Sequence, residues 1–107
     1  MSGQAVITVE GLPRDAVGAA STFYAEWAGQ IARAASEGAT EVAVVLPAAG
    51  VDHSDWRRAA ARDLARSAAP VRVNLMAAGG AASCSATLTY LRDAPGVTGH
   101  YLVLNDD

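Results

Sequence analysis

The side chains best suited to acid–base chemistry lie together in the segment Asp52-His53-Ser54-Asp55. A histidine beside a carboxylate can take up and release a proton near neutral pH, so His53 and Asp52 are candidates for an acid/base pair. The alternative is structural. Asp52 or Ser54 would then cap the helix that begins here, and His53 would be exposed to solvent. We favour the structural interpretation and expect no catalytic residue.

Other reactive side chains are few. Cys84 stands among small residues of an expected helix and has no evident base beside it, so we interpret it as a packing residue. His53, His100 and Cys84 are too few and too scattered to predict a metal site. All basic residues are arginine, which excludes chemistry that needs a Schiff-base lysine or a phosphate-loop lysine.

Composition bounds the class of protein further. A net charge of −3 argues against a general nucleic-acid binder. The single cysteine allows no internal disulfide, which suits a reducing compartment. Apolar runs fall far short of the roughly 20 residues that a membrane helix needs, and the first residues resemble no secretory signal. We therefore expect a cytoplasmic protein without a membrane segment.

Apolar β-branched runs alternate with amphipathic helical patterns along the chain. This alternation predicts one α/β domain over residues 1–107, with a four-stranded parallel sheet in the order β-α-β-α-β-α-β. The expected strands are Ala5–Val9, Val42–Leu46, Val71–Met76 and Tyr101–Leu104. The expected helices run over about 15–37, with Asp15 as cap, 55–68 and 82–93.

The first expected helix has an unusually wide apolar face. We expect a row at helical spacing to seat it on the sheet, and Phe23 and Trp27 widen that row. The row comprises Val17, Ala20, Tyr24, Ala28 and Ile31. Either an aromatic ring folds over its own helix end, or this face is a subunit interface, which we favour.

The second expected helix carries Trp56 on one face and a row of arginines on another. Arg58, Arg62 and Arg66 recur at every fourth position, with Arg57 nearby. Such rows are usually solvated surface, and an anion-binding role is the less favoured alternative.

Small residues follow two of the expected strands. Ligands of open α/β sheets bind outside the carboxyl ends of the strands. A small-molecule pocket could therefore form there, lined by Ala48, Gly50, His53, Ala78 and Gly79.

Several short motifs resemble the short-chain dehydrogenase/reductase family. Arg72-Val73-Asn74 is similar to the family's Arg-Val-Asn on its sixth strand, and 61–65 resembles the end of its active-site helix. Thr98-Gly99 and 102–104 resemble its last turn and strand, and 88–91 the helix before them. Ala48-Ala49-Gly50 stands where the family has its catalytic serine loop. The resemblance maps the chain onto the second half of the family's fold, its strands four to seven.

The resemblance implies strands in sequence order, with the last helix alone on its face of the sheet. It also marks what these residues lack: a Gly-rich dinucleotide turn, the family's Tyr-x-x-x-Lys and its substrate lid. We therefore expect a truncated, non-catalytic relative that binds no cofactor.

The family forms a four-helix subunit interface through the equivalent helices. We accordingly expect an interaction module, a homodimer formed through Phe23, Tyr24, Trp27, Ile31 and Trp56. The exposed edge of the first strand is an alternative dimerisation surface, or a docking site for a full-length reductase. A small-molecule or nucleotide sensor that uses the strand ends is the alternative function, and a residual enzyme using His53 is the third.

Overall fold

A computed structural model describes residues 3–104 of the chain. Its strands are β1 (Gln4–Thr8), β2 (Glu41–Leu46), β3 (Arg72–Ala77) and β4 (Tyr101–Val103). They form one four-stranded sheet in the order β1-β2-β3-β4, and every neighbouring pair is parallel. The predicted fold class and strand order are confirmed.

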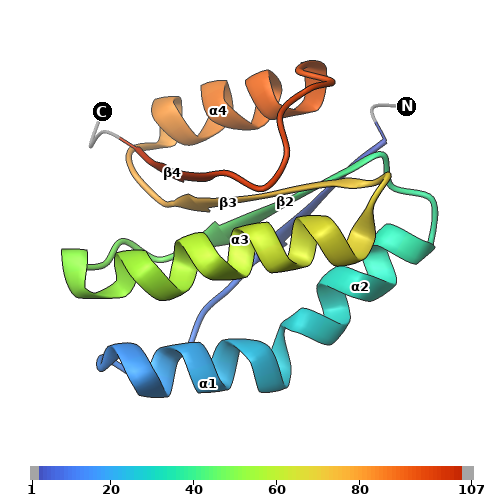
Figure 1. The fold of residues 1–107 in the computed structure, drawn as a ribbon. Helices are drawn as coiled ribbons and strands as arrows, with labels where there is room; N and C mark the ends of the chain where they lie inside the picture. Colours follow the sequence, from blue (N-terminus) through green and yellow to red (C-terminus); the bar gives the residue numbers. More distant parts are fainter. Residues whose placement is uncertain (1–2, 105–107) are drawn as a thin grey trace.

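Helices cover both faces of the sheet. They are α1 (Ala16–Glu26), α2 (Ala28–Ser36), α3 (Ser54–Ala68) and α4 (Ala81–Asp93), with a short 3-10 turn, η1 (Val51–His53), before α3. Figure 1 shows α1, α2 and α3 on one face and α4 alone on the other. The chain crosses the sheet in one direction throughout, so the change of face gives the β3–α4–β4 crossover the opposite hand. The resemblance implied this arrangement, against the general preference for one hand.

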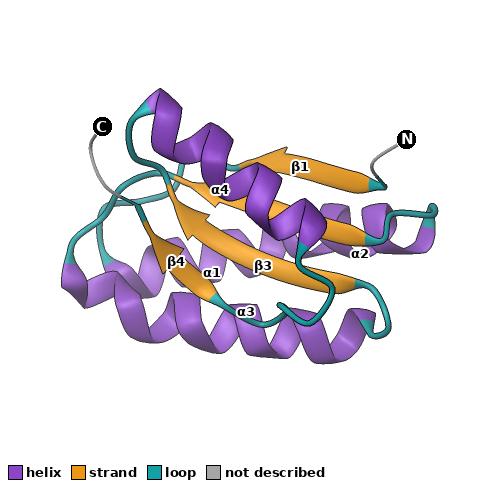
Figure 2. Ribbon diagram, turned by 90° about the horizontal axis from the view of Figure 1, so that it is seen from above, coloured by secondary structure: helices purple, strands orange, loops and turns teal. Residues whose placement is uncertain are grey.

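The two faces of the sheet bury separate apolar clusters. Val42, Val44 and Leu46 of β2 join the larger cluster beneath α1–α3, and Ala43 joins Met76 in the smaller one beneath α4. Figure 2 looks onto the face with α4 lying over the strands. A central strand that is apolar on both faces is the pattern of a buried parallel sheet.

The helix expected over about 15–37 is two helices in the structure. Asp15 caps α1 as predicted, and its carboxylate accepts a hydrogen bond from the Gly18 N–H at 2.7 Å. At Trp27 the backbone departs from regular helix, with φ −113° and ψ −30°, and α2 then continues in a new direction (Figure 1). The expectation of one continuous helix was therefore wrong.

The buried residues of α1 and α2 differ from the predicted seating row. Ala19, Phe23 and Ile31 are buried, whereas Val17 is 81% exposed and Tyr24 43% exposed. The predicted seating row was wrong in α1, where Ala19 and Phe23 are the buried residues in place of Val17 and Tyr24. Two shorter helices can each turn an apolar side inward, so a small sheet covers more of the aromatic face than a single helix would allow.

A candidate ligand pocket at the carboxyl edge of the sheet

The strand ends, the loop after β1 and the loop after β2 enclose a cavity of about 350 Å³. The amino ends of α1 and α3 lie at the same edge (Figure 1). Exposed residues of the two loops form the rim, and Ala19, His53 and Arg57 form a buried floor. The lining residues are Leu12, Pro13, Arg14, Ala19, Pro47, Ala48, Ala49, Gly50, Asp52, His53 and Arg57. A cavity of this size suits a small metabolite.

His53 is a structural part of this floor. Only 6% exposed, it bridges the two loops: Nε2 lies 2.9 Å from the Arg14 carbonyl oxygen, and Nδ1 lies 3.0 Å from Trp56 Nε1. An indole N–H can only donate, so Nδ1 accepts and Nε2 carries the proton that it donates to Arg14. Both ring nitrogens of the neutral imidazole are thereby used.

The expectation of an exposed His53 beside a capping residue was wrong. No side-chain hydrogen bond caps α3, and Asp52 lies in the preceding turn with its carboxylate 3.8 Å from His53 Nε2. His53 is instead the residue that ties the β1–α1 loop to the start of α3. Its buried position could not be read from a sequence in which polar residues flank it on both sides.

Arg57 is the buried lining residue of the cavity that the sequence interpretation missed. It is 1% exposed, although it adjoins the arginine row of α3, which is solvent-exposed as expected. Its Nη1 donates to the Pro47 carbonyl oxygen at 2.9 Å and to the Tyr101 hydroxyl at 3.1 Å. The guanidinium carbon lies 5.4 Å from the Trp56 ring centroid and 5.7 Å from that of Tyr101.

The charge of Arg57 has no counter-ion within residues 3–104. No carboxylate of that range lies within 4.0 Å of its nitrogens, and the buried Nε has no hydrogen-bond partner there. A buried cation is costly unless it is paired, and a buried donor without an acceptor adds to that cost. The arrangement provides an electropositive floor at the inner end of the cavity.

The structure brings together part of the predicted pocket. Ala48, Gly50 and His53 line the same cavity. Ala78 and Gly79 do not line it, because the loop after β3 leads to α4 on the other face of the sheet. The cavity forms instead between two loops whose helices share one face, and Leu12, Pro13 and Arg14 supply the wall that was not foreseen.

The predicted interface residues divide into two groups. Phe23 and Ile31 are interior residues of the single chain, and Phe23 packs against Trp56 with ring centroids 5.4 Å apart, so these two are unavailable to a partner. Trp27 and Trp56 are part-buried against the same cluster. Tyr24 is exposed, and partial burial together with the nearby Asp63 carboxylate raises its pKa above 10.0.

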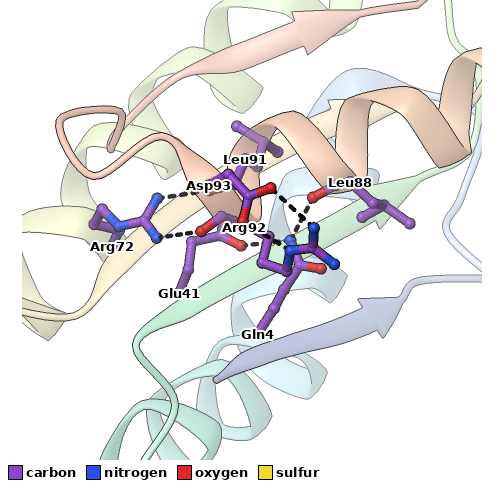
Figure 3. Close-up of polar contacts among 7 residues, drawn as sticks. All are labelled: Gln4, Glu41, Arg72, Leu88, Leu91, Arg92 and Asp93. Atoms are coloured by element: carbon purple, nitrogen blue, oxygen red, sulfur yellow. Dashed lines mark hydrogen bonds and ion pairs between the residues drawn. The ribbon is translucent and has the colours of Figure 1, made fainter. Parts of the chain in front are cut away.

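A second polar cluster lies beneath α4 (Figure 3). The buried Glu41 carboxylate accepts from Gln4 Nε2 at 2.8 Å and from Asn74 Nδ2 at 3.2 Å. Asn74 also donates to the Val97 carbonyl oxygen and accepts from the His100 N–H. Arg72 donates to the Leu91, Arg92 and Ala94 carbonyl oxygens at the end of α4. Within the Arg-Val-Asn motif, Arg72 therefore binds the end of α4, and Asn74 binds the segment between α4 and β4.

Two other hollows have few charged side chains in their linings. One of about 500 Å³ lies at the amino end of the sheet, and among the described residues that line it, exposed Glu37 is the charged one. An apolar groove of about 200 Å³ runs between α2 and α3, lined by Ile31, Ala32, Ala35, Ser36, Leu64, Ser67 and Ala68. Within the described range, no group of three metal-ligating side chains is placed to hold a metal ion. No helix in that range is long and apolar enough to cross a membrane.

The comparison with known families agrees with this architecture. The model of the family described as short chain dehydrogenase-like protein matches residues 7–104. No curated protein and no solved structure matches the chain significantly. Because the matched range covers most of the chain, from the last residues of β1 through β4, the chain belongs to the short chain dehydrogenase-like protein family.

Proposed function

We propose that this chain is a non-catalytic member of its family that binds a small polar molecule in the cavity at the carboxyl edge of the sheet. The observation that supports it best is Arg57, a buried cation that lines this cavity and has no counter-ion among residues 3–104. A site of this kind is typical of a ligand pocket, in which a few fixed polar groups stand among apolar walls. The bound molecule would then act as a signal for a partner protein.

The absence of catalysis in this proposal is supported by the residues themselves. The sequence contains no lysine, so none of its tyrosines belongs to a Tyr-x-x-x-Lys motif. These residues therefore do not form the family's acid–base pair. His53, the remaining acid–base candidate, uses both ring nitrogens in hydrogen bonds to Arg14 and Trp56. A general base needs a free lone pair within reach of the substrate.

Ligand-dependent stability tests the binding function. Thermal unfolding should be measured against a panel of nucleotides, short carboxylates, hydroxy compounds and neutral amides. A ligand present at 100 times its dissociation constant is expected to add about 2.7 kcal/mol to the free energy of unfolding. A panel that leaves the unfolding temperature unchanged throughout would argue against the proposal.

A matched pair of variants assigns the effect to the cavity. Ala48 lies on the exposed rim, so Ala48→Trp should obstruct the mouth and abolish the stabilisation without loss of fold. Ala82 is exposed on α4 and lines none of the hollows described above, so Ala82→Trp should leave the stabilisation intact. Equal stabilisation of both variants would place the ligand elsewhere.

Activity measurements test the non-catalytic part separately. The pure protein, mixed with NADH or NADPH and a range of aldehydes and ketones, should oxidise no cofactor beyond the rate of a protein-free blank. Sustained carbonyl reduction that follows the amount of this protein would overturn it.

Self-association through the helical face is the second candidate function. Exposed Tyr24 and the apolar groove between α2 and α3 favour it, because apolar surface of this kind is enriched in subunit contacts. A full-length reductase is the heterologous partner that the family suggests. Light scattering at increasing concentration should show a dimer that Ala35→Arg disrupts, and a monomer at all concentrations would contradict the homodimer.

A further inference from the structure

We infer that the carboxyl-edge cavity is a site for a small organic monoanion, with a monocarboxylate as its simplest chemical class, and that Arg57 is the residue that binds it. The inference rests on the proposed ligand-binding function and specifies the chemistry of the ligand. It is carried by the hydrogen bonds, burial and charge balance around Arg57.

The guanidinium of Arg57 uses only part of its hydrogen-bonding capacity within residues 3–104. Its Nη1 is occupied by the Pro47 carbonyl oxygen and the Tyr101 hydroxyl. Neither Nε nor Nη2 has an acceptor within residues 3–104, and Nε is out of contact with solvent. These two nitrogens form one edge of the planar guanidinium, and because Nε is enclosed by protein atoms, Nη2 is the donor of this edge that is left for the carboxylate of a ligand.

Neighbouring side chains and a backbone carbonyl hold the guanidinium of Arg57 in a fixed orientation. Arg57 lies close to the rings of Trp56 and Tyr101, and its Nη1 is tied to the end of β2 through Pro47. A guanidinium held from several sides loses little conformational entropy when it binds an anion, which favours affinity for a small ligand.

The charges of the lining residues favour a ligand with a single negative charge. Two arginines, Arg14 and Arg57, line it together with one aspartate, Asp52, and His53 is neutral by its hydrogen bonds. The lining thus has two positive charges and one negative charge, which sum to one positive charge. A monoanion balances this lining, whereas a dianion such as phosphate would bring an uncompensated charge beside Asp52.

The size of the cavity and its apolar walls favour a ligand with a short aliphatic group. The cavity of about 350 Å³ is walled by Leu12, Pro13, Ala19 and the alanines of the β2–α3 loop. These side chains offer apolar contact and few hydrogen bonds, so they suit a short aliphatic group attached to the anionic head. A branched carboxylate of a few carbons combines both properties.

The test compares a carboxylate with its neutral isostere. Isobutyrate and isobutyramide have nearly the same shape, and only isobutyrate has the charge and the second oxygen. Calorimetric titration of the wild-type protein should show isobutyrate binding at least about tenfold more tightly than isobutyramide, the effect of a charge-assisted hydrogen bond. Phosphate and sulfate should bind more weakly than isobutyrate.

Two variants on α3 assign the preference to Arg57. Arg57→Gln should abolish the preference for isobutyrate over isobutyramide, and Arg57→Lys should keep only part of it, because an ammonium group has the charge but not the planar, fixed donor geometry of a guanidinium. Arg58, an exposed neighbour outside this cavity, provides the control, and Arg58→Gln should bind isobutyrate as the wild type does.

The outcomes separate this inference from the proposed function. Equal binding of isobutyrate and isobutyramide in the cavity would overturn the anion site and leave a ligand pocket. Absence of isobutyrate binding would also overturn it, while the wider panel still tests the pocket. A preference that survives Arg57→Gln would show that Arg57 is not the binding group. The wild-type comparison decides the matter even if an Arg57 variant fails to fold.

Discussion

His53 joins two segments that are distant in sequence, because its ring nitrogens bond to the Arg14 carbonyl oxygen and to Trp56 Nε1. The same side chain forms part of the floor beside Arg57. At the scale of the residue, the pocket therefore depends on hydrogen bonds that hold its two loops together. Loss of the imidazole would leave a carbonyl and an indole N–H without their partners.

We predict that His53→Ala destabilises the protein by about 1–3 kcal/mol, the typical cost of buried polar groups that lose their partners. Urea unfolding monitored by tryptophan fluorescence measures the change. His100→Ala is the control, because His100 is exposed and its side chain makes no described contact, so its effect should stay within about 0.5 kcal/mol. Equal effects of the two substitutions would show that the His53 bridge has no special role.

Sequence reasoning identified His53, Ala48 and Gly50 for the pocket, since the end of a parallel strand is a recurrent place for ligands. Arg57 was missed for a physical reason. Helical periodicity places it beside exposed arginines, and nothing local shows that Tyr101, 44 positions further on, reaches the same point to accept its hydrogen bond. Only the folded chain reveals that this arginine is buried.

At the scale of the element, α4 lies alone on its face of the sheet. Few apolar residues, among them Leu91, Met76 and Ala43, are buried beneath it. Arg72 adds hydrogen bonds to three carbonyl oxygens at its carboxyl end, where a positive charge also interacts favourably with the helix dipole. We infer that Arg72 fastens the helix whose apolar contact alone is small.

We predict that Arg72→Met lowers the free energy of unfolding by about 2–3 kcal/mol, because hydrogen bonds from a charged donor are among the stronger ones. Hydrogen exchange should accelerate most in the last turns of α4. Arg66→Met is the control, since Arg66 pairs only with exposed Asp63 at the surface, and surface ion pairs contribute little. Uniform acceleration in all helices would contradict the fastening role.

The neighbouring rings of Phe23 and Tyr24 differ in burial, which separates a core residue from a possible interface residue. Phe23 is buried against Trp56, so we predict that Phe23→Ala costs about 3–5 kcal/mol of stability whatever the protein concentration. Tyr24→Ser should cost about 1 kcal/mol or less in the monomer, because much of the ring is exposed. If the cost of Phe23→Ala rose with protein concentration, Phe23 would belong to a subunit contact after all.

At the scale of the whole molecule, the sheet has helices on both faces, and its strand order and the face of α4 were both foreseen from the resemblance. The general preference for right-handed crossovers would have placed α4 with the other helices. Alternation of apolar strands and helices sufficed for the fold class, but a small break such as that at Trp27 leaves no mark in the periodicity. The pocket forms where loops from two crossovers on one face meet.

The Nε–H group of Arg57 provides the most direct test of this account. Because Nε is buried and has no acceptor within residues 3–104, its proton should give a slowly exchanging signal in a ¹H–¹⁵N spectrum. Added isobutyrate should shift this signal together with the backbone signals of residues 48–53. Shifts confined to the residues that line the groove between α2 and α3, or an Arg57 Nε–H signal that isobutyrate leaves unmoved while it perturbs other parts of the protein, would contradict the account.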